Sequence, residues 1–269
     1  METHVNRCSI SYRTVGKGVP IVFIQGVGIH GSGWDPQVSE LGANFRCITF
    51  DNRGIGESQP AGAAITVNQM VEDTLAVMDA AGVRTAHIVG HSLGGMIAQR
   101  VAQTARPRVL SLSLLCTSGR GADATRPALD LIWLGIRSNV GPLRSRRMAF
   151  LRVVLPDAYI ATQDRNALAA RFAKIIGHDP GVPPPVTMKQ LGALRGFDGR
   201  PALSQLAGIP TLVIAAAHDR IFPPRFVRAL ALGIPGARYV ELDGAHGVTI
   251  QRSAEVNQQL RDHFSRVAP

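Results

Sequence analysis

The chain has 269 residues, of which 45% are hydrophobic and 18% charged, with a formal net charge of +10 and a pI near 10.7. This length suits one large α/β domain or two small ones, and the composition is ordinary for a soluble globular protein. The excess of cations does not favour nucleic-acid binding. The cations are scattered, and the only cluster, at 144–147, lacks interleaved aromatic residues and a recognised binding module.

Membrane insertion and secretion are also disfavoured. No apolar run approaches the roughly 18 residues of a membrane span, and the N-terminus lacks the charged-then-apolar pattern of a signal peptide. Three cysteines, Cys8, Cys47 and Cys116, are interpreted as reduced thiols of a cytoplasmic protein. We therefore expect neither nucleic acid nor membrane as a partner, and the sequence leaves a homodimer open.

Strand and helix patterns alternate along the chain. Strands are predicted over 9–15, 20–25, 46–50, 85–90, 109–116, 211–216 and 237–242. Helices are predicted from about 34, from a threonine cap at Thr66 to the glycine at 82, from the elbow described below to before Pro107, from about 224, and over 253–267. The apolar strands and their alternation with helices predict a mostly parallel, doubly wound sheet.

One long segment interrupts this alternation. Residues 118–205 show no buried-strand pattern, only helix-like pieces at 129–134, 148–155 and 167–176. The segment holds 13 Arg and Lys against 6 Asp, a local net charge of +7. We therefore predict a core of residues 1–118 and 206–269 and a helical cap insertion of residues 119–205. Its place after a strand favours a lid over the carboxyl edge of the sheet, and an insertion without that role is the alternative.

Residues 85–98 carry the chemistry. They read as a short strand, a Gly-x-Ser-x-Gly turn and the start of a helix, which is the context required of a nucleophile elbow. Gly90, Gly94 and Gly95 are expected to supply conformational freedom, and Ser92 would project its hydroxyl at a helix N-terminus. The alternative is a glycine-rich turn that contains a serine by chance.

A serine nucleophile needs a base that is itself oriented by a carboxylate. Asp219 directly follows the strand that begins at 211, and His246 directly follows the strand that ends at 242. Each could alone be an ordinary loop residue, but together with the elbow they predict a Ser92-Asp219-His246 triad. Asp243 is the alternative acid.

The oxyanion hole is expected to combine the N–H of Leu93 with that of Val27, with Gly28 as the alternative to Val27. Gly26 and Gly28 would let the backbone approach the substrate. By position alone, the pocket candidates are Trp133, Ile221 and Val248. No Cys/His cluster has the spacing of metal ligands, so we expect no metal or organic cofactor.

The chain closely resembles the α/β-hydrolase fold superfamily over essentially its whole length. The matching features are Gly-His-Ser-Leu-Gly-Gly at 90–95, Asp-x-Arg-Gly-x-Gly-x-Ser at 51–58, the acid Asp219, and Gly-Ala-His at 244–246. One departure is Gln25-Gly26, where the family usually has His-Gly. The resemblance implies acyl transfer through the triad, and the 51–58 turn is interpreted as support for the oxyanion loop.

Serine at the elbow disfavours the epoxide and halide chemistry of relatives that carry aspartate there. The leading hypothesis is a hydrolase of a small to medium apolar carboxylic ester or lactone. A cofactor-free perhydrolase and a C–C bond hydrolase are alternatives on the same triad. A ligand receptor or a catalytically silent member of the fold is the alternative from another class.

Overall fold

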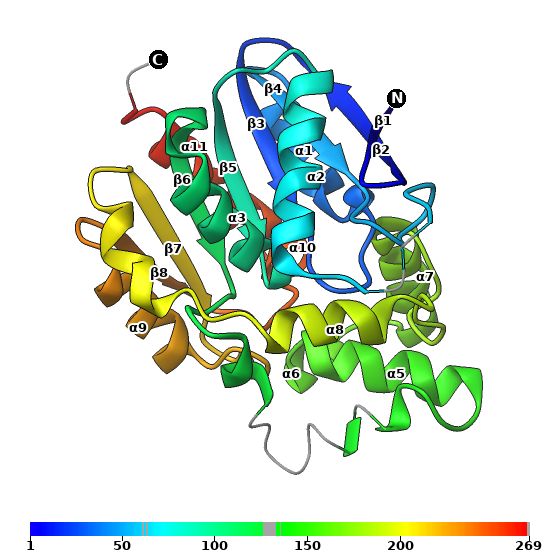
Figure 1. The fold of residues 1–269 in the computed structure, drawn as a ribbon. Helices are drawn as coiled ribbons and strands as arrows, with labels where there is room; N and C mark the ends of the chain where they lie inside the picture. The colour runs from blue at the N-terminus through cyan, green and yellow to red at the C-terminus, as the bar shows by residue number, and fades with distance from the viewer. Residues whose placement is uncertain (61, 63, 126–132, 135, 268–269) are drawn as a thin grey trace.

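A computed structural model describes residues 1–60, 62, 64–125, 133–134 and 136–267. Its strands form one sheet in the order β1-β2-β4-β3-β5-β6-β7-β8 (Figure 1). The bounds are β1 Glu2–Val5, β2 Cys8–Val15, β3 Val19–Ile24, β4 Phe45–Phe50, β5 Ala86–His91, β6 Val109–Leu115, β7 Thr211–Ala216 and β8 Arg238–Leu242. Strand β2 pairs antiparallel with β1 and β4, and all other pairs are parallel, which confirms the predicted mostly parallel sheet.

Helices cover both faces of this sheet. Their bounds are α1 Asp35–Leu41, α2 Val67–Ala80, α3 Leu93–Thr104, α5 Leu143–Val154, α6 Asp157–Ala161, α7 Arg165–Ile176, α8 Thr187–Arg195, α9 Pro224–Gly233, α10 Val248–Gln251 and α11 Ser253–Phe264. Alternate residues of a strand point to opposite faces. In β3, Val22 and Ile24 pack with α2, α3 and α9, whereas Ile21 and Phe23 pack with α1 and α11.

The differences from the predicted elements have simple causes. Strand β1 and helix α10 have four residues each, too few to show a periodic pattern. The exposed tip of β1 also lacks the apolar alternation of a buried strand. The helix predicted over 129–134 lies largely outside the described residues.

Helices α5 to α8 lie between β6 and β7 in the chain and gather below one end of the sheet (Figure 1). We call residues 119–205 the insertion. Its helices α5 to α7 form a small hydrophobic core with Ile250 of α10, and Ile29 of the loop after β3 packs onto it. The members of that core are Leu151, Leu155, Ile160, Leu168, Ala169, Phe172, Ile176 and Ile250. The insertion is therefore attached to the loop that follows β3.

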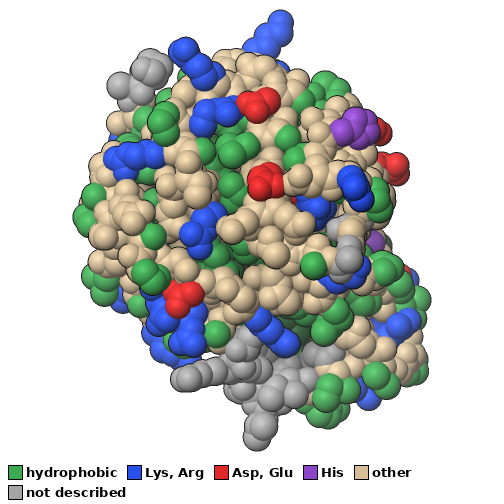
Figure 2. All heavy atoms as spheres, in the orientation of Figure 1, with side chains coloured by type: hydrophobic (Ala, Val, Ile, Leu, Met, Phe, Trp, Pro, Cys, Tyr) green, Lys and Arg blue, Asp and Glu red, His purple; other side chains and the backbone are tan. Residues whose placement is uncertain are grey.

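The surface agrees with the scattered charge seen in the sequence. Figure 2 shows Lys and Arg side chains spread over one face of the molecule, with no single dense cluster. No helix among the described residues is long and apolar enough to cross a membrane.

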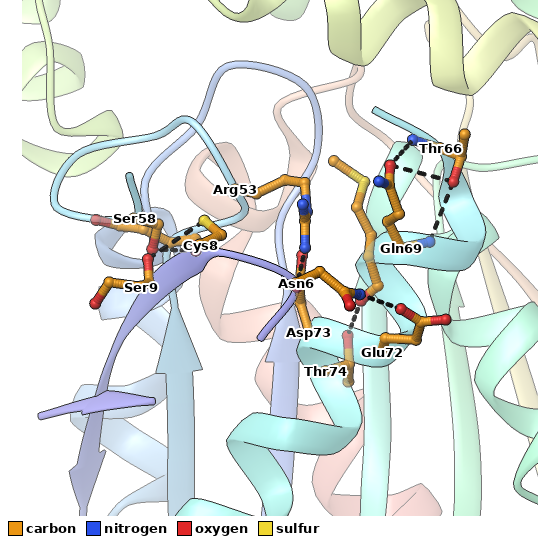
Figure 3. Close-up of polar contacts among 12 residues, drawn as sticks. Asn6, Cys8, Ser9, Arg53, Ser58, Thr66, Gln69, Glu72, Asp73 and Thr74 are labelled. Carbon is orange, nitrogen blue, oxygen red and sulfur yellow. Dashed lines mark hydrogen bonds and ion pairs between the residues drawn. The ribbon is translucent and has the colours of Figure 1, made fainter. Parts of the chain in front are cut away.

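The turn at 51–58 is anchored by a buried ion pair (Figure 3). Arg53 Nε and Nη2 donate to the two carboxylate oxygens of Asp73 on α2, at 2.7 and 2.5 Å. Both side chains are almost fully buried. The same helix begins with a capping box, in which Thr66 and Gln69 each bond the other's backbone N–H, and this confirms the predicted threonine cap.

Two buried histidines should make the fold acid-sensitive. Burial, then the neighbouring His263, lowers the pKa of His87 to about 4, and burial, then Arg238, lowers the pKa of His263 to about 4. Between about pH 6.5 and pH 4, these two imidazoles are therefore protonated in the unfolded chain and neutral in the native state. We expect the free energy of unfolding to fall between these values, by up to about 1.4 kcal/mol per pH unit for each histidine.

Urea unfolding at several pH values from 7 to 4 checks this expectation. His87→Gln should flatten the dependence on pH, whereas His4→Gln at the exposed N-terminus should leave it unchanged. Equal slopes for the wild type and His87→Gln would contradict it.

Candidate active site

Ser92 sits at the point where β5 turns into α3. Its backbone adopts φ 56° and ψ −120°, in the left-handed half of conformational space that L-residues rarely use. Its N–H donates to Leu115 O at 3.0 Å, and Thr117 Oγ donates to Ser92 O at 2.8 Å. The turn is thus fixed from β6, and Leu93 begins the helix, where N–H groups lack intrahelical partners.

The glycines of the elbow serve a different purpose from the one expected. Gly90, Gly94 and Gly95 do not have positive φ, so the strain falls on Ser92 itself. Instead, a Cβ on Gly94 would lie 2.0 Å from Ile24 O, and one on Gly90 would lie 2.2 Å from Gly94 O. These glycines let α3, β5 and the end of β3 approach one another, and their conformational freedom is not what the turn needs.

Gly94→Ala should therefore damage the fold. The added methyl group meets backbone atoms that cannot rotate away, so we expect a loss of about 3 kcal/mol or more, the upper end for overpacking. Gly192→Ala is the matched control, because nothing lies within 4 Å of its added Cβ on α8. It should be neutral or stabilise by up to about 1 kcal/mol. Thermal unfolding of both variants measures the difference, and equal melting temperatures would contradict the steric argument.

Asp219 and His246 meet beside the elbow. His246 Nδ1 lies 2.8 Å from Asp219 Oδ2, and both side chains are buried. The other carboxylate oxygen, Oδ1, accepts the N–H groups of Ile221 and Phe222 at 2.8 and 3.0 Å. Asp243, the alternative acid, is exposed and pairs with Arg252 and His218, so it does not contact the His246 ring.

His91 joins the elbow to the loop that carries His246. Its Nε2 lies 2.8 Å from His246 O, and the two rings are 4.7 Å apart. A carbonyl oxygen only accepts, so Nε2 is the protonated nitrogen. Burial, then the nearby His246, lowers the pKa of His91 to about 3. His91 is therefore neutral, and its hydrogen bond holds the loop that carries His246.

Cys116 lies behind the acid. Cys116 directly follows β6 and is a free, fully buried thiol, in agreement with the reduced state expected from the sequence. Burial, then the charge of Asp219 and a hydrogen bond to it, raises the pKa of the Cys116 thiol well above its usual value. The thiol therefore keeps its proton and donates to the carboxylate.

Among the described residues, one group of side chains has the composition of a metal site. Ligand atoms of His91, Cys116 and His246 lie within 4.8 Å of one another. In this arrangement, however, His91 Nε2 and His246 Nδ1 are both engaged in hydrogen bonds, and the Cys116 thiol is protonated. These side chains therefore form the hydrogen bonds that hold Asp219 and His246 in place, and they are not arranged as free metal ligands.

The loop after β3 approaches the nucleophile closely. A Cβ on Gly26 would lie 3.1 Å from Ser92 Cβ. Gln25, the departure from the family pattern, folds back so that its Oε1 accepts the Gly26 N–H at 3.0 Å. The 51–58 turn supports this loop: Asn52 Nδ2 donates to Gln25 O at 2.8 Å, and Asp51 accepts the Gly31 N–H at 2.7 Å.

A cavity of about 500 Å³ opens between the insertion and the loop that carries Asp219. It is lined by Trp133, Leu134, Arg152, Asp157 and Arg220. Trp133 is one of the lining residues, and the lining contains none of Ser92, Asp219 and His246. Ile221 packs against one core cluster, and Val248 is fully buried in the other.

Two residues of the insertion contact the loop after β3, and the sequence did not single out either of them. Gln190 Oε1 accepts the Gly28 N–H at 2.8 Å, and His178 Nε2 lies 3.0 Å from Gly28 O. Gln190 is 162 positions from Gly28, and it lies in a helix without a motif. No pattern in the sequence signals this contact.

Comparison with known proteins adds to this geometry. The family model for the alpha/beta hydrolase fold matches residues 19–252. A protein of Azorhizobium caulinodans, provisionally named carbamate hydrolase RutD, is 30% identical over 96% of this chain and 95% of its own. One of Mycobacterium tuberculosis, provisionally named non-heme bromoperoxidase BpoC, is 33% identical over 96% of this chain and 98% of its own. The crystal structure of an enol-lactonase from Burkholderia xenovorans superposes with a TM-score of 0.82 at 25% identity, covering 98% of this chain and all of the lactonase.

Proposed function

Since the chain belongs to the α/β-hydrolase fold family, we propose that it is a serine hydrolase that cleaves a carboxylic ester or lactone. The observation that carries the proposal is the strained Ser92 at a helix N-terminus beside a histidine bonded to a buried aspartate. Strain of this kind persists where the surrounding structure holds it, and it is concentrated at functional sites.

In the proposed mechanism, His246 Nε2 accepts the hydroxyl proton as Ser92 Oγ attacks the substrate carbonyl carbon. Asp219 holds His246 with Nδ1 protonated, which leaves Nε2 to act as the base. The N–H groups of Val27 and Leu93 stabilise the oxyanion. Collapse expels the alcohol, which takes the proton from His246, and water activated by His246 then releases the acid and restores Ser92.

The substrate class rests on two supports. The structural relative with enol-lactonase activity covers nearly all of this chain, and a lactone is a cyclic ester with the same attacked carbonyl. The cavity lined by Trp133, Arg152 and Arg220 lies beside the loop that carries Asp219, and the proposal assigns it to the substrate. Carbamates, from the name of one sequence relative, and peroxyacid formation, from the perhydrolase alternative, belong in the same substrate panel.

Labelling with a fluorophosphonate probe tests the proposal. We expect an adduct that peptide mapping places on Ser92, that is absent in Ser92→Ala and that forms much more slowly in His246→Ala. A panel of esters, lactones, carbamates and peroxyacid-forming reactions would then identify the substrate. A folded wild-type protein that is neither labelled nor active would overturn the proposal and favour a ligand receptor on this fold.

A further inference from the structure

The side chain of Gln190 lies fully buried between the insertion and the core. Its Oε1 accepts the N–H of Gly28, at 2.8 Å, in the loop after β3. Its Nε2 donates to the carbonyl oxygen of Arg53, at 3.3 Å, in the 51–58 turn. Both ends of one amide on α8 are therefore used to connect the insertion to two loops of the core.

This contact decides which N–H groups of the loop are available. The Gly26 N–H donates to Gln25 Oε1, and the Gly28 N–H donates to Gln190 Oε1. Among the described residues, Val27 N–H has no hydrogen-bond partner. The Val27 N–H is thus an unoccupied donor between two occupied ones, and the neighbouring Gly26 approaches Ser92.

Other contacts of the insertion hold the same loop. His178 Nε2 donates to Gly28 O, so the insertion contacts both the N–H and the carbonyl of that glycine. Gly28 has φ 76°, a left-handed conformation that glycine adopts without the steric cost of a Cβ. Further along, Ser32 Oγ donates to Ile175 O at 2.8 Å, and Ile29 packs onto the core of the insertion.

We propose that Gln190 is a positioning residue: it occupies the Gly28 N–H and thereby fixes Val27 N–H as the oxyanion donor of the loop. Catalysis then depends on the insertion being docked, because α8 carries the group that sets the loop. Preorganised donors stabilise an oxyanion more than donors that must reorient during the reaction. This inference rests on the proposed hydrolase function.

Gln190→Met tests the proposal, since methionine has a similar length and no hydrogen-bonding amide. We expect kcat to fall roughly 10- to 100-fold while KM changes by less than about threefold, because the contact acts on the transition state. Lys189→Met is the matched control on the same helix. Lys189 is exposed and contacts Gly62 O, not the loop after β3, so its kcat should stay at the wild-type value.

A second variant separates positioning from a general loss of packing. Protonated glutamic acid has the same acceptor and donor as glutamine, whereas its carboxylate would face the Arg53 carbonyl with no proton to donate. The kcat of Gln190→Glu, divided by that of wild type at each pH, should therefore rise as the pH falls. A ratio that does not change with pH, or a Gln190→Met enzyme with wild-type kcat, would overturn the proposal even if the melting temperature falls.

Hydrogen exchange gives a readout that does not require activity. In Gln190→Met, amides of residues 26–30 should exchange roughly tenfold faster than in wild type and in Lys189→Met, because one bonded N–H is released. Unchanged exchange would overturn the connection between α8 and the loop. A wild-type protein that fails to label at Ser92 would overturn the proposed function instead, so the two failures are distinguishable.

Discussion

Ser92→Ala should lower kcat/KM by roughly 10⁴- to 10⁶-fold, and His246→Ala by a similar factor. Because the two groups act as a unit, the double variant should be no slower than the worse single variant. Asp219→Asn should cost roughly 10³- to 10⁴-fold, since the histidine would then be held in the wrong tautomer. Steady-state kinetics on the best ester or lactone substrate measures all four.

Asp243→Asn is the matched control for the acid. Asp243 is exposed and bonded to Arg252, so its loss should leave kcat/KM within about twofold of wild type, as for surface changes away from such features. If Asp243→Asn were as slow as Asp219→Asn, the assignment of the acid would be wrong. If Ser92→Ala retained activity, the nucleophile would be wrong.

Arg53→Met should destabilise the fold by about 3–5 kcal/mol, because it leaves the Asp73 carboxylate buried without its partner. That is a large part of the 5–15 kcal/mol by which a domain is usually stable. The double variant Arg53→Met/Asp73→Leu removes both charges and should recover most of the loss. Urea unfolding measures each free energy.

Arg200→Met provides the comparison at the surface. Arg200 bonds Asp198 at 2.6 Å, but both side chains are about half exposed, so the change should leave the free energy of unfolding close to its wild-type value. Equal losses for Arg53→Met and Arg200→Met would mean that burial does not set the cost. A double variant no more stable than Arg53→Met would mean that the arginine acts through packing.

The parts of the fold that followed from sequence are those with local signals. Buried parallel strands appear as apolar runs, and the residues of the proposed triad lie in the turns after them, so Ser92, Asp219 and His246 could be placed at strand ends. The threonine cap of α2 is likewise a signal within four residues. Such features depend on neighbours in the chain.

The parts that did not follow depend on contacts across the fold. Gly94 is glycine because Ile24 O lies against it, which no local pattern reveals. The contact between the His91 ring and His246 O joins residues 155 positions apart, so only the structure shows that His91 holds the loop that carries His246. The contact of Gln190 with Gly28 joins two segments 162 positions apart, and an isolated glutamine in a helix gives no signal of it.

The placement of the insertion also bears on how this scaffold could be re-engineered. Ser92, Asp219 and His246 all come from outside residues 119–205, so exchanging that segment for another helical segment would keep all three residues of the proposed triad. A graft that lacked an amide at the position of Gln190 would nevertheless release the Gly28 N–H. Chimeras that transplant substrate preference therefore need to carry this one glutamine with the new segment, whatever else they replace.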